Sequence, residues 1–147
     1  MDNENIKLGL ELRLTLQAFD KRVEKSFFSF NHPELKKMNM FILNFLFKNS
    51  NRDVFQKDIE RHFNYRKSSV SDHLSVLENC GCIIRESNSS DGRYRKIVIT
   101  DKGRELCKEF NLELQKIEEE LRVKLSKEKI SEIVLNLGKI RKCLLGD

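Results

Sequence analysis

A single change of hydrophobic period, between residues 83 and 100, constrains the fold of this chain more than any other feature. Elsewhere apolar residues recur every three or four positions, as they do on amphipathic helices. Residues 83–86 and 95–100 instead favour two strands, and the polar segment 87–93 between them has the composition of a turn. The sequence therefore predicts a mainly α chain with a small β-hairpin, an α+β fold.

The helical pattern has few interruptions. The chain contains one proline and six glycines, which argues against a loop-rich β-sandwich and against a glycine-rich nucleotide-binding loop. Pro33 is predicted in the first turn of a helix, where its missing N–H costs nothing, and Gly81 in the left-handed cap after another helix. We expect helices at residues 6–28, 31–49, 54–63, 68–79, 100–125 and 126–144.

The sequence argues against a membrane protein and against an enzyme. No apolar stretch approaches the roughly 20 residues of a membrane span, and the acidic start is unlike a signal peptide, so a cytoplasmic location is expected. The histidines and cysteines lack ligand-like spacing and no catalytic motif is present, so we expect no metal, no cofactor and no enzymatic activity. The cysteines are interpreted as buried thiols, with oxidant sensing by Cys80 or Cys82 as the alternative.

The central segment has the element order of a winged helix-turn-helix: short helix, turn, helix and two-stranded hairpin. The second of these helices is short enough to enter a major groove of duplex DNA. Basic side chains in its first turns would neutralise phosphates, and hydroxyls would contact phosphates or base edges. One serine is expected to cap the helix, and His73 is open between a DNA contact and a neutral surface residue. The candidate contacts are Arg66, Lys67, Ser68, Ser69, Ser71, Asp72 and His73.

Three stretches of this sequence carry a family resemblance. Residues 68–83 (SSVSDHLSVLENCGCI), Asp91-Gly92-Arg93 in the hairpin, and residues 97–103 (IVITDKG) together resemble the MarR family of bacterial transcriptional regulators. The resemblance implies a homodimer that binds a pseudo-palindromic operator in double-stranded DNA, in most cases as a repressor. It also implies that Arg93 enters the minor groove and that Asp91 orients it, and both belong to a polar hairpin tip that also carries Arg95 and Lys96.

One position departs from the family pattern. Asp72 stands where the family frequently has a basic residue. A carboxylate repels phosphates and can only accept hydrogen bonds, for instance from a cytosine amino group. The base preference at this position is therefore open.

Apolar stripes in the flanking helices predict a dimer. They carry more apolar surface than one small winged domain can cover, and exposed stripes of this size normally indicate a partner. We expect residues 1–31 and 105–147 to form a helical dimerisation region and residues 32–104 to form the winged helix-turn-helix domain. The candidate dimerisation residues are Leu12, Leu16, Phe19, Leu114, Ile117, Leu121, Ile133, Leu137 and Ile140.

Two further interpretations stay open. The family resemblance implies control by a small, often aromatic or phenolic, effector, and Phe27, His32, Met38 and Phe41 form a candidate pocket for it. An aromatic stripe at helical spacing is more often core, however. The alternative to DNA binding is a helical dimer whose winged domain binds a protein partner. Salt dependence separates the two, because phosphate contacts release counterions.

Overall fold

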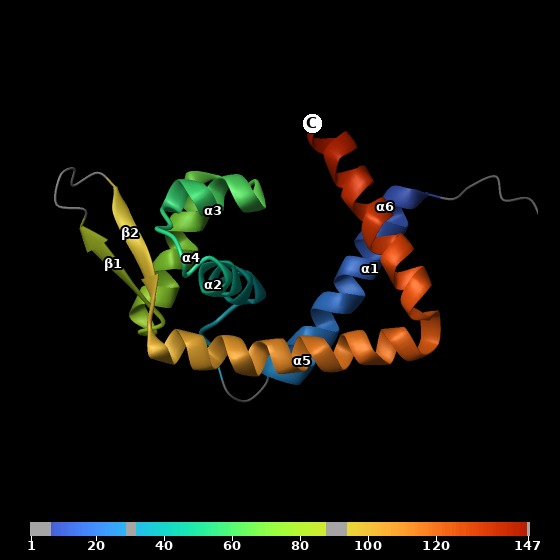
Figure 1. Cartoon of the computed structure of the whole chain (residues 1–147), viewed down its shortest axis with the longest axis horizontal. Coiled ribbons are helices and arrows are strands. Elements are labelled where there is room, and N and C mark those ends of the chain that lie inside the picture. The colour runs from blue at the N-terminus through green and yellow to red at the C-terminus, as the bar shows by residue number, and fades with distance from the viewer. Residues whose placement is uncertain (1–6, 29–31, 88–93, 147) are drawn as a thin grey trace, which may run out of the picture. The chain divides into compact units, whose positions relative to one another are not determined.

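The computed structural model describes residues 7–28, 32–87 and 94–146. Contacts divide the chain into two compact units, residues 1–111 and 112–147. Six α-helices, one π-helical turn and two strands are present in the described residues (Figure 1). In chain order they are α1 (Leu8–Val23), η1 (Glu24–Phe28), α2 (Lys37–Lys48), α3 (Gln56–Phe63), α4 (Lys67–Asn79), β1 (Ile83–Ser87), β2 (Arg95–Ile99), α5 (Asp101–Leu125) and α6 (Lys127–Leu145). This arrangement is a winged helix with flanking helices, which confirms the predicted fold class.

The hydrophobic core lies in the first unit. Helix α4 packs against α2, α3 and β1. The side chains of Val70, Leu74 and Leu77, predicted as its inner face, are completely buried. Strands β1 and β2 are antiparallel, with Ile83 opposite Ile99 and Ser87 opposite Arg95. The hairpin is therefore tied to α4 at one end and open toward solvent at the other.

Helix α2 begins later than predicted. The prediction placed Pro33 in its first turn, but the main-chain N–H of Leu35 donates to the carbonyl of His32 at 3.1 Å and closes a turn around Pro33. Proline is favoured at the second position of such a turn because its φ is already set. The helix begins at Lys37, and the Oδ1 of Asn39 accepts the main-chain N–H of Lys36 at 2.8 Å.

Val54 was predicted in a helix but lies in an extended segment. Its carbonyl accepts the main-chain N–H of Ile97 at 2.8 Å, so this segment pairs with the outer edge of β2. Helix α3 starts two residues later, where Asp58 Oδ2 accepts the main-chain N–H of Phe55 at 2.8 Å. Competition from the β2 edge, which local periodicity does not reveal, explains the difference.

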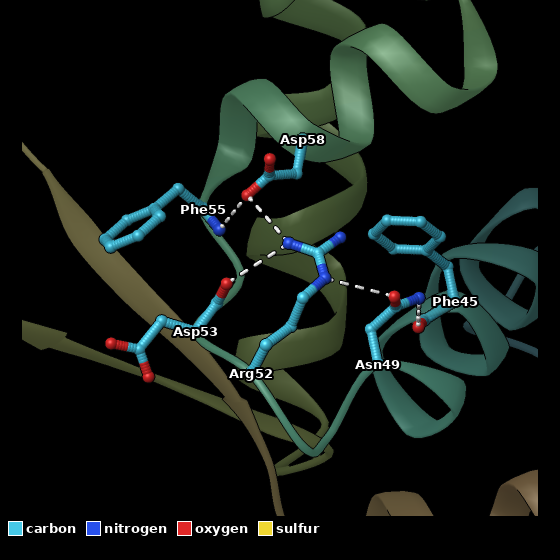
Figure 2. A network of polar contacts seen from close by, with 6 residues as sticks. All are labelled: Phe45, Asn49, Arg52, Asp53, Phe55 and Asp58. Atoms are coloured by element: carbon cyan, nitrogen blue, oxygen red, sulfur yellow. Dashed lines mark hydrogen bonds and ion pairs between the residues drawn. The ribbon is translucent and has the colours of Figure 1, made fainter.

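An arginine joins the end of α2 to the start of α3 (Figure 2). Arg52 Nε donates to Asn49 Oδ1 at 3.2 Å, and its Nη1 donates to the carbonyl of Asp53 at 3.3 Å. The same Nη1 lies 3.8 Å from Asp58 Oδ2. Asn49 Nδ2 in turn donates to the carbonyl of Phe45, which satisfies the end of α2. The network holds the 49–54 connection in place beside β2.

The cap at the end of α4 was predicted correctly, and the cap at its start was not. Gly81 has φ +72°, and the N–H groups of Gly81 and Cys82 donate to the carbonyls of Glu78 and Leu77, as in a Schellman motif. At the start, Arg66 occupies the N-cap position and no side chain caps it. All three candidate serines lie inside the helix, past the extended residue at which a side chain can cap.

The second unit contains the end of α5 and helix α6. Ser126 separates the two helices, as predicted, and its Oγ accepts the main-chain N–H of Lys129 at 3.5 Å. No residue of α6 is buried, and Val134, Leu135 and Leu144 are more than half exposed. Among the described residues, no helix is both long enough and apolar enough to cross a bilayer.

Candidate nucleic-acid interface

The exposed face of α4 carries short polar side chains. Successive residues of a helix turn by about 100°, so the face opposite Val70, Leu74 and Leu77 presents Ser68, Asp72 and Ser75. These three side chains are exposed to solvent. Ser69 and Ser71 are half-buried at the sides of this face, while Arg66 and Lys67 are exposed at its start. Ser75 was missed by the sequence reasoning, although the spacing of the three buried residues could have identified it.

Neighbouring elements hold α4 at both ends. Gln56 Nε2, at the start of α3, donates to the carbonyl of Lys67 at 3.2 Å. At the other end, Arg85 of β1 donates from Nη2 to Ser75 Oγ at 3.2 Å, and its Nε lies 3.3 Å from Glu78 Oε2. Helix α4 is thus fixed both to α3 and to the hairpin.

A basic groove lies between α3, α4 and the hairpin. It has a volume of about 470 Å³, with Leu74 and Ile97 among its lining residues. Four cations line it, Lys57, Lys67, Arg85 and Arg95, against one carboxylate, Glu60. This charge balance favours a polyanion such as a phosphate backbone.

Three lining residues of this basic groove were missed by the sequence reasoning: Lys57, Arg85 and Tyr94. Lys57 Nζ lies 5.4 Å from the centre of the Tyr94 ring, a cation–π contact between α3 and the residue that precedes β2. Lys57 is distant in the sequence from both Arg85 and Tyr94, so no local motif could place it beside the hairpin.

The predicted hairpin residues divide into three groups. Arg95 is exposed and lines the basic groove. Lys96 forms an ion pair with Asp53, with Nζ 2.7 Å from Oδ1, and this hydrogen bond raises the pKa of Lys96. Asp53, in the connection between α2 and α3, therefore compensates the positive charge of Lys96. Asp91 and Arg93 lie outside the described residues.

The surroundings of His73 favour the neutral form of its imidazole. Burial, and secondarily the positive charge of Lys36, lower its pKa, while Asp72 opposes the shift. Its ring stacks on that of Tyr65, with 6.5 Å between the ring centres and 27° between the ring planes. A neutral imidazole offers one donor and one acceptor, so His73 is suited to a hydrogen bond more than to a fixed phosphate contact.

Three of the four candidate effector residues, Phe27, His32 and Phe41, lie in an aromatic cluster around Phe110 of α5. Phe27 stacks on His32 at 5.6 Å, and both Phe27 and Phe41 contact the Phe110 ring edge-on, at 5.2 and 5.7 Å. Phe110 is completely buried and Met38 is half-buried. The rings fill the space around Phe110 by packing against one another.

Of the four cysteines interpreted as buried thiols, Cys82 and Cys107 are buried, Cys80 is half-buried and Cys143 is exposed. Burial is the main cause that raises the pKa of Cys80 and of Cys82, and the carboxylate of Glu34 adds to it for both. Burial also raises the pKa of Cys107 to about 12. Because the thiolate is the reactive form, this environment disfavours oxidant sensing. Within the described part of the chain, no cluster of three His, Cys, Asp or Glu side chains could hold a metal ion.

The candidate dimerisation residues are exposed to different degrees. Leu16, Leu121, Ile133 and Leu137 are exposed, with Leu16 at 60%. Only Ile117 of the nine is buried within the chain itself. The half-buried ones are Leu12, Phe19, Leu114 and Ile140.

Helix α4 presents a polar face to solvent and packs against α2, α3 and the hairpin. This arrangement defines a winged helix-turn-helix protein. Residues 35–93 match the family model described as the MarR family. This match includes the segment 68–83, which carries family motifs of the sequence, and it agrees with the resemblance predicted from those motifs.

Known proteins agree with this assignment. Over 89 residues the chain is 26% identical to the uncharacterised HTH-type transcriptional regulator YdgJ of Bacillus subtilis (strain 168), covering 60% of this chain and 54% of that protein. Over 96 residues it is 26% identical to the HTH-type transcriptional regulator BilQ of Clostridioides difficile (strain CD3), covering 65% of each. The chain thus spans about half of the first relative and just under two-thirds of the second.

Solved structures show the same fold. The chain is similar to MepR of S. aureus in its complex with DNA, with a TM-score of 0.85 and 21% identity over 95% of this chain and 99% of that one. At this identity the likeness establishes the fold alone.

Proposed function

We propose that this chain is a transcriptional regulator that binds duplex DNA through α4 and the hairpin. The observation that carries the proposal is the basic groove beside the exposed face of α4, where Lys57, Lys67, Arg85 and Arg95 gather around one carboxylate. In this mode Ser68, Asp72 and Ser75 face base edges in the major groove, and Lys57, Lys67 and Arg95 lie along the phosphates. Arg93 enters the adjacent minor groove.

The proposal includes a homodimer. Exposed apolar side chains on α1 and on α6, such as Leu16 and Ile133, support it, because a monomer seldom leaves so many exposed. A two-fold axis would place two α4 helices on a pseudo-palindromic operator, with half-sites about one helical turn apart. Binding at a promoter blocks polymerase, which makes the protein a repressor. A chromosomal target also agrees with the expected cytoplasmic location.

The proposal also includes control by a small effector, for which Phe27, His32, Met38 and Phe41 are the candidate residues. The cluster of Phe27, His32 and Phe41 around Phe110 joins η1, α2 and α5. Met38 lies in the first turn of α2. A small aromatic molecule that separates these rings would shift the equilibrium between DNA-competent and incompetent states.

Selection of bound duplexes from a random library tests the proposed function. We expect recovery of one pseudo-palindromic sequence, and an affinity that falls steeply as salt rises. An affinity that is insensitive to salt, or no enriched sequence, would favour the protein-interaction alternative.

Arginine variants then test the site. Arg95→Ala and Arg93→Ala are each expected to lower the affinity for the selected duplex roughly tenfold. Lys108→Ala is the matched control, because it removes one exposed positive charge from α5 outside the basic groove. Equal affinities for all three variants would remove the hairpin from the mechanism.

A further inference from the structure

Helix α4 is also held by a buried side chain that lies outside the exposed site. Asn39, in the first turn of α2, is completely buried. Its Nδ2 donates to the main-chain carbonyl of His73, in the middle of α4, at 3.1 Å. Its Oδ1 accepts the main-chain N–H of Lys36 at 2.8 Å. One side-chain amide thus joins the start of α2 to the centre of α4.

The other buried contacts of α4 are apolar. Val70, Leu74 and Leu77 are completely buried, as are Met40 and Leu43 of α2, the helix that packs against α4. Apolar packing has no preferred direction, so it tolerates a small rotation or slide of one helix on another. A hydrogen bond weakens steeply when its angle changes. The Asn39 hydrogen bond therefore favours one orientation of α4 over orientations that are slightly rotated or shifted.

The orientation of α4 decides which residues face outward. His73 follows Asp72 directly and lies two residues before Ser75, so its carbonyl is in the turn that carries the exposed polar face. A rotation by one residue, about 100°, would replace Ser68, Asp72 and Ser75 by their neighbours on that face. A smaller rotation would already misalign hydrogen bonds to base edges.

We propose that Asn39 is a positioning residue for operator recognition: it sets the rotation and axial position of α4 and contacts no DNA itself. This inference rests on the proposed function. In this view, the buried amide of Asn39 contributes to the discrimination between DNA sequences. The basic groove attracts any duplex electrostatically, whatever its sequence.

Comparing specific with non-specific binding tests the role. The affinities of wild type and Asn39→Leu are measured for the selected operator and for a random duplex, at a temperature where circular dichroism shows both proteins folded. We expect Asn39→Leu to lose roughly tenfold in affinity for the operator, with its affinity for the random duplex unchanged. A smaller folded fraction would instead lower both affinities equally.

Two further variants sharpen the result. Asn44→Leu removes another buried amide from α2, one that contacts Asn111 of α5, and should leave the ratio of operator to random binding as in wild type. Asn39→Ser keeps an acceptor near the Lys36 N–H but is too short to span the present distance to His73, and should reproduce the Asn39→Leu loss.

The outcomes distinguish a failure of the positioning role of Asn39 from a failure of the proposed function. A wild-type ratio in both Asn39 variants, or equal losses on the two duplexes, overturns the positioning role alone. A wild-type protein that prefers no duplex overturns the proposed function, and this inference with it.

Discussion

At the scale of single residues, Gly103 shows how closely two segments approach. A Cβ at this position would lie 2.3 Å from the carbonyl oxygen of Cys82 and 2.8 Å from Cγ1 of Ile99. The start of α5 meets the end of α4 here, where Thr100 Oγ1 donates to the carbonyl of Gly81 at 2.7 Å and accepts the main-chain N–H of Gly103 at 3.2 Å. The glycine is required for space, since its φ is not positive.

Gly103→Ala is therefore expected to destabilise the protein by roughly 2 kcal/mol or more, because a backbone segment must move to admit the methyl group. In an open helix the same change stabilises by about 0.5–1 kcal/mol. Gly138→Ala in α6 is the control, as nothing lies within 4 Å of a Cβ there. Urea unfolding measures both, and a Gly103→Ala protein as stable as wild type would contradict the close approach.

At the scale of elements, a reciprocal amide pair joins α2 to α5. Asn44 Nδ2 donates to Asn111 Oδ1 at 2.8 Å, and Asn111 Nδ2 donates to Asn44 Oδ1 at 3.1 Å. Asn44 is only 7% exposed, so each amide depends on the other for a partner. The pair specifies one register between the two helices.

A double-mutant cycle measures this link. Asn44→Leu and Asn111→Leu are each expected to lower the free energy of unfolding by about 1 kcal/mol or more, because each leaves the other amide unpaired. The double variant should lose less than the sum, with a coupling of about 0.5–1.5 kcal/mol. Asn44→Leu combined with Gly138→Ala should be additive. An additive Asn44/Asn111 pair would show that the two amides act independently.

At the scale of the whole molecule, the proposed dimer is tested by charges on exposed apolar positions. Ile117 is unsuitable because it is buried within the chain, and a charge there would unfold the protein. Leu16 is 60% exposed and Ile133 46%. Leu16→Glu with Ile133→Glu should keep the helical content and reduce the mass in light scattering from about twice 17.4 kDa to that of one chain.

The control for this change is Ile84→Glu, which puts a charge on an equally exposed apolar residue of the hairpin. It should keep the wild-type mass. A double Leu16/Ile133 variant that also retains the wild-type mass would place the subunit interface elsewhere on the chain.

Local properties of the sequence determined the elements of this protein. Apolar spacing identified each helix, the change of period marked the hairpin, and Gly81 marked the end of α4, because hydrophobic period and turn chemistry act over a few neighbouring residues. The same locality identified the family motifs and the inner face of α4. It failed at Pro33 and Val54, where a turn and the edge of β2 competed with the helical pattern.

The tertiary structure decided everything that depends on residues distant in the sequence. It brought Lys57 to Tyr94, paired Lys96 with Asp53, and placed Asn39 on the backbone of α4. None of these contacts has a local signal, since each joins two segments that are equally compatible with other neighbours. The sequence alone thus specified which helix is the candidate for DNA contact. The packing of α2, α3 and the hairpin around that helix specified how it is held and where the positive charges lie.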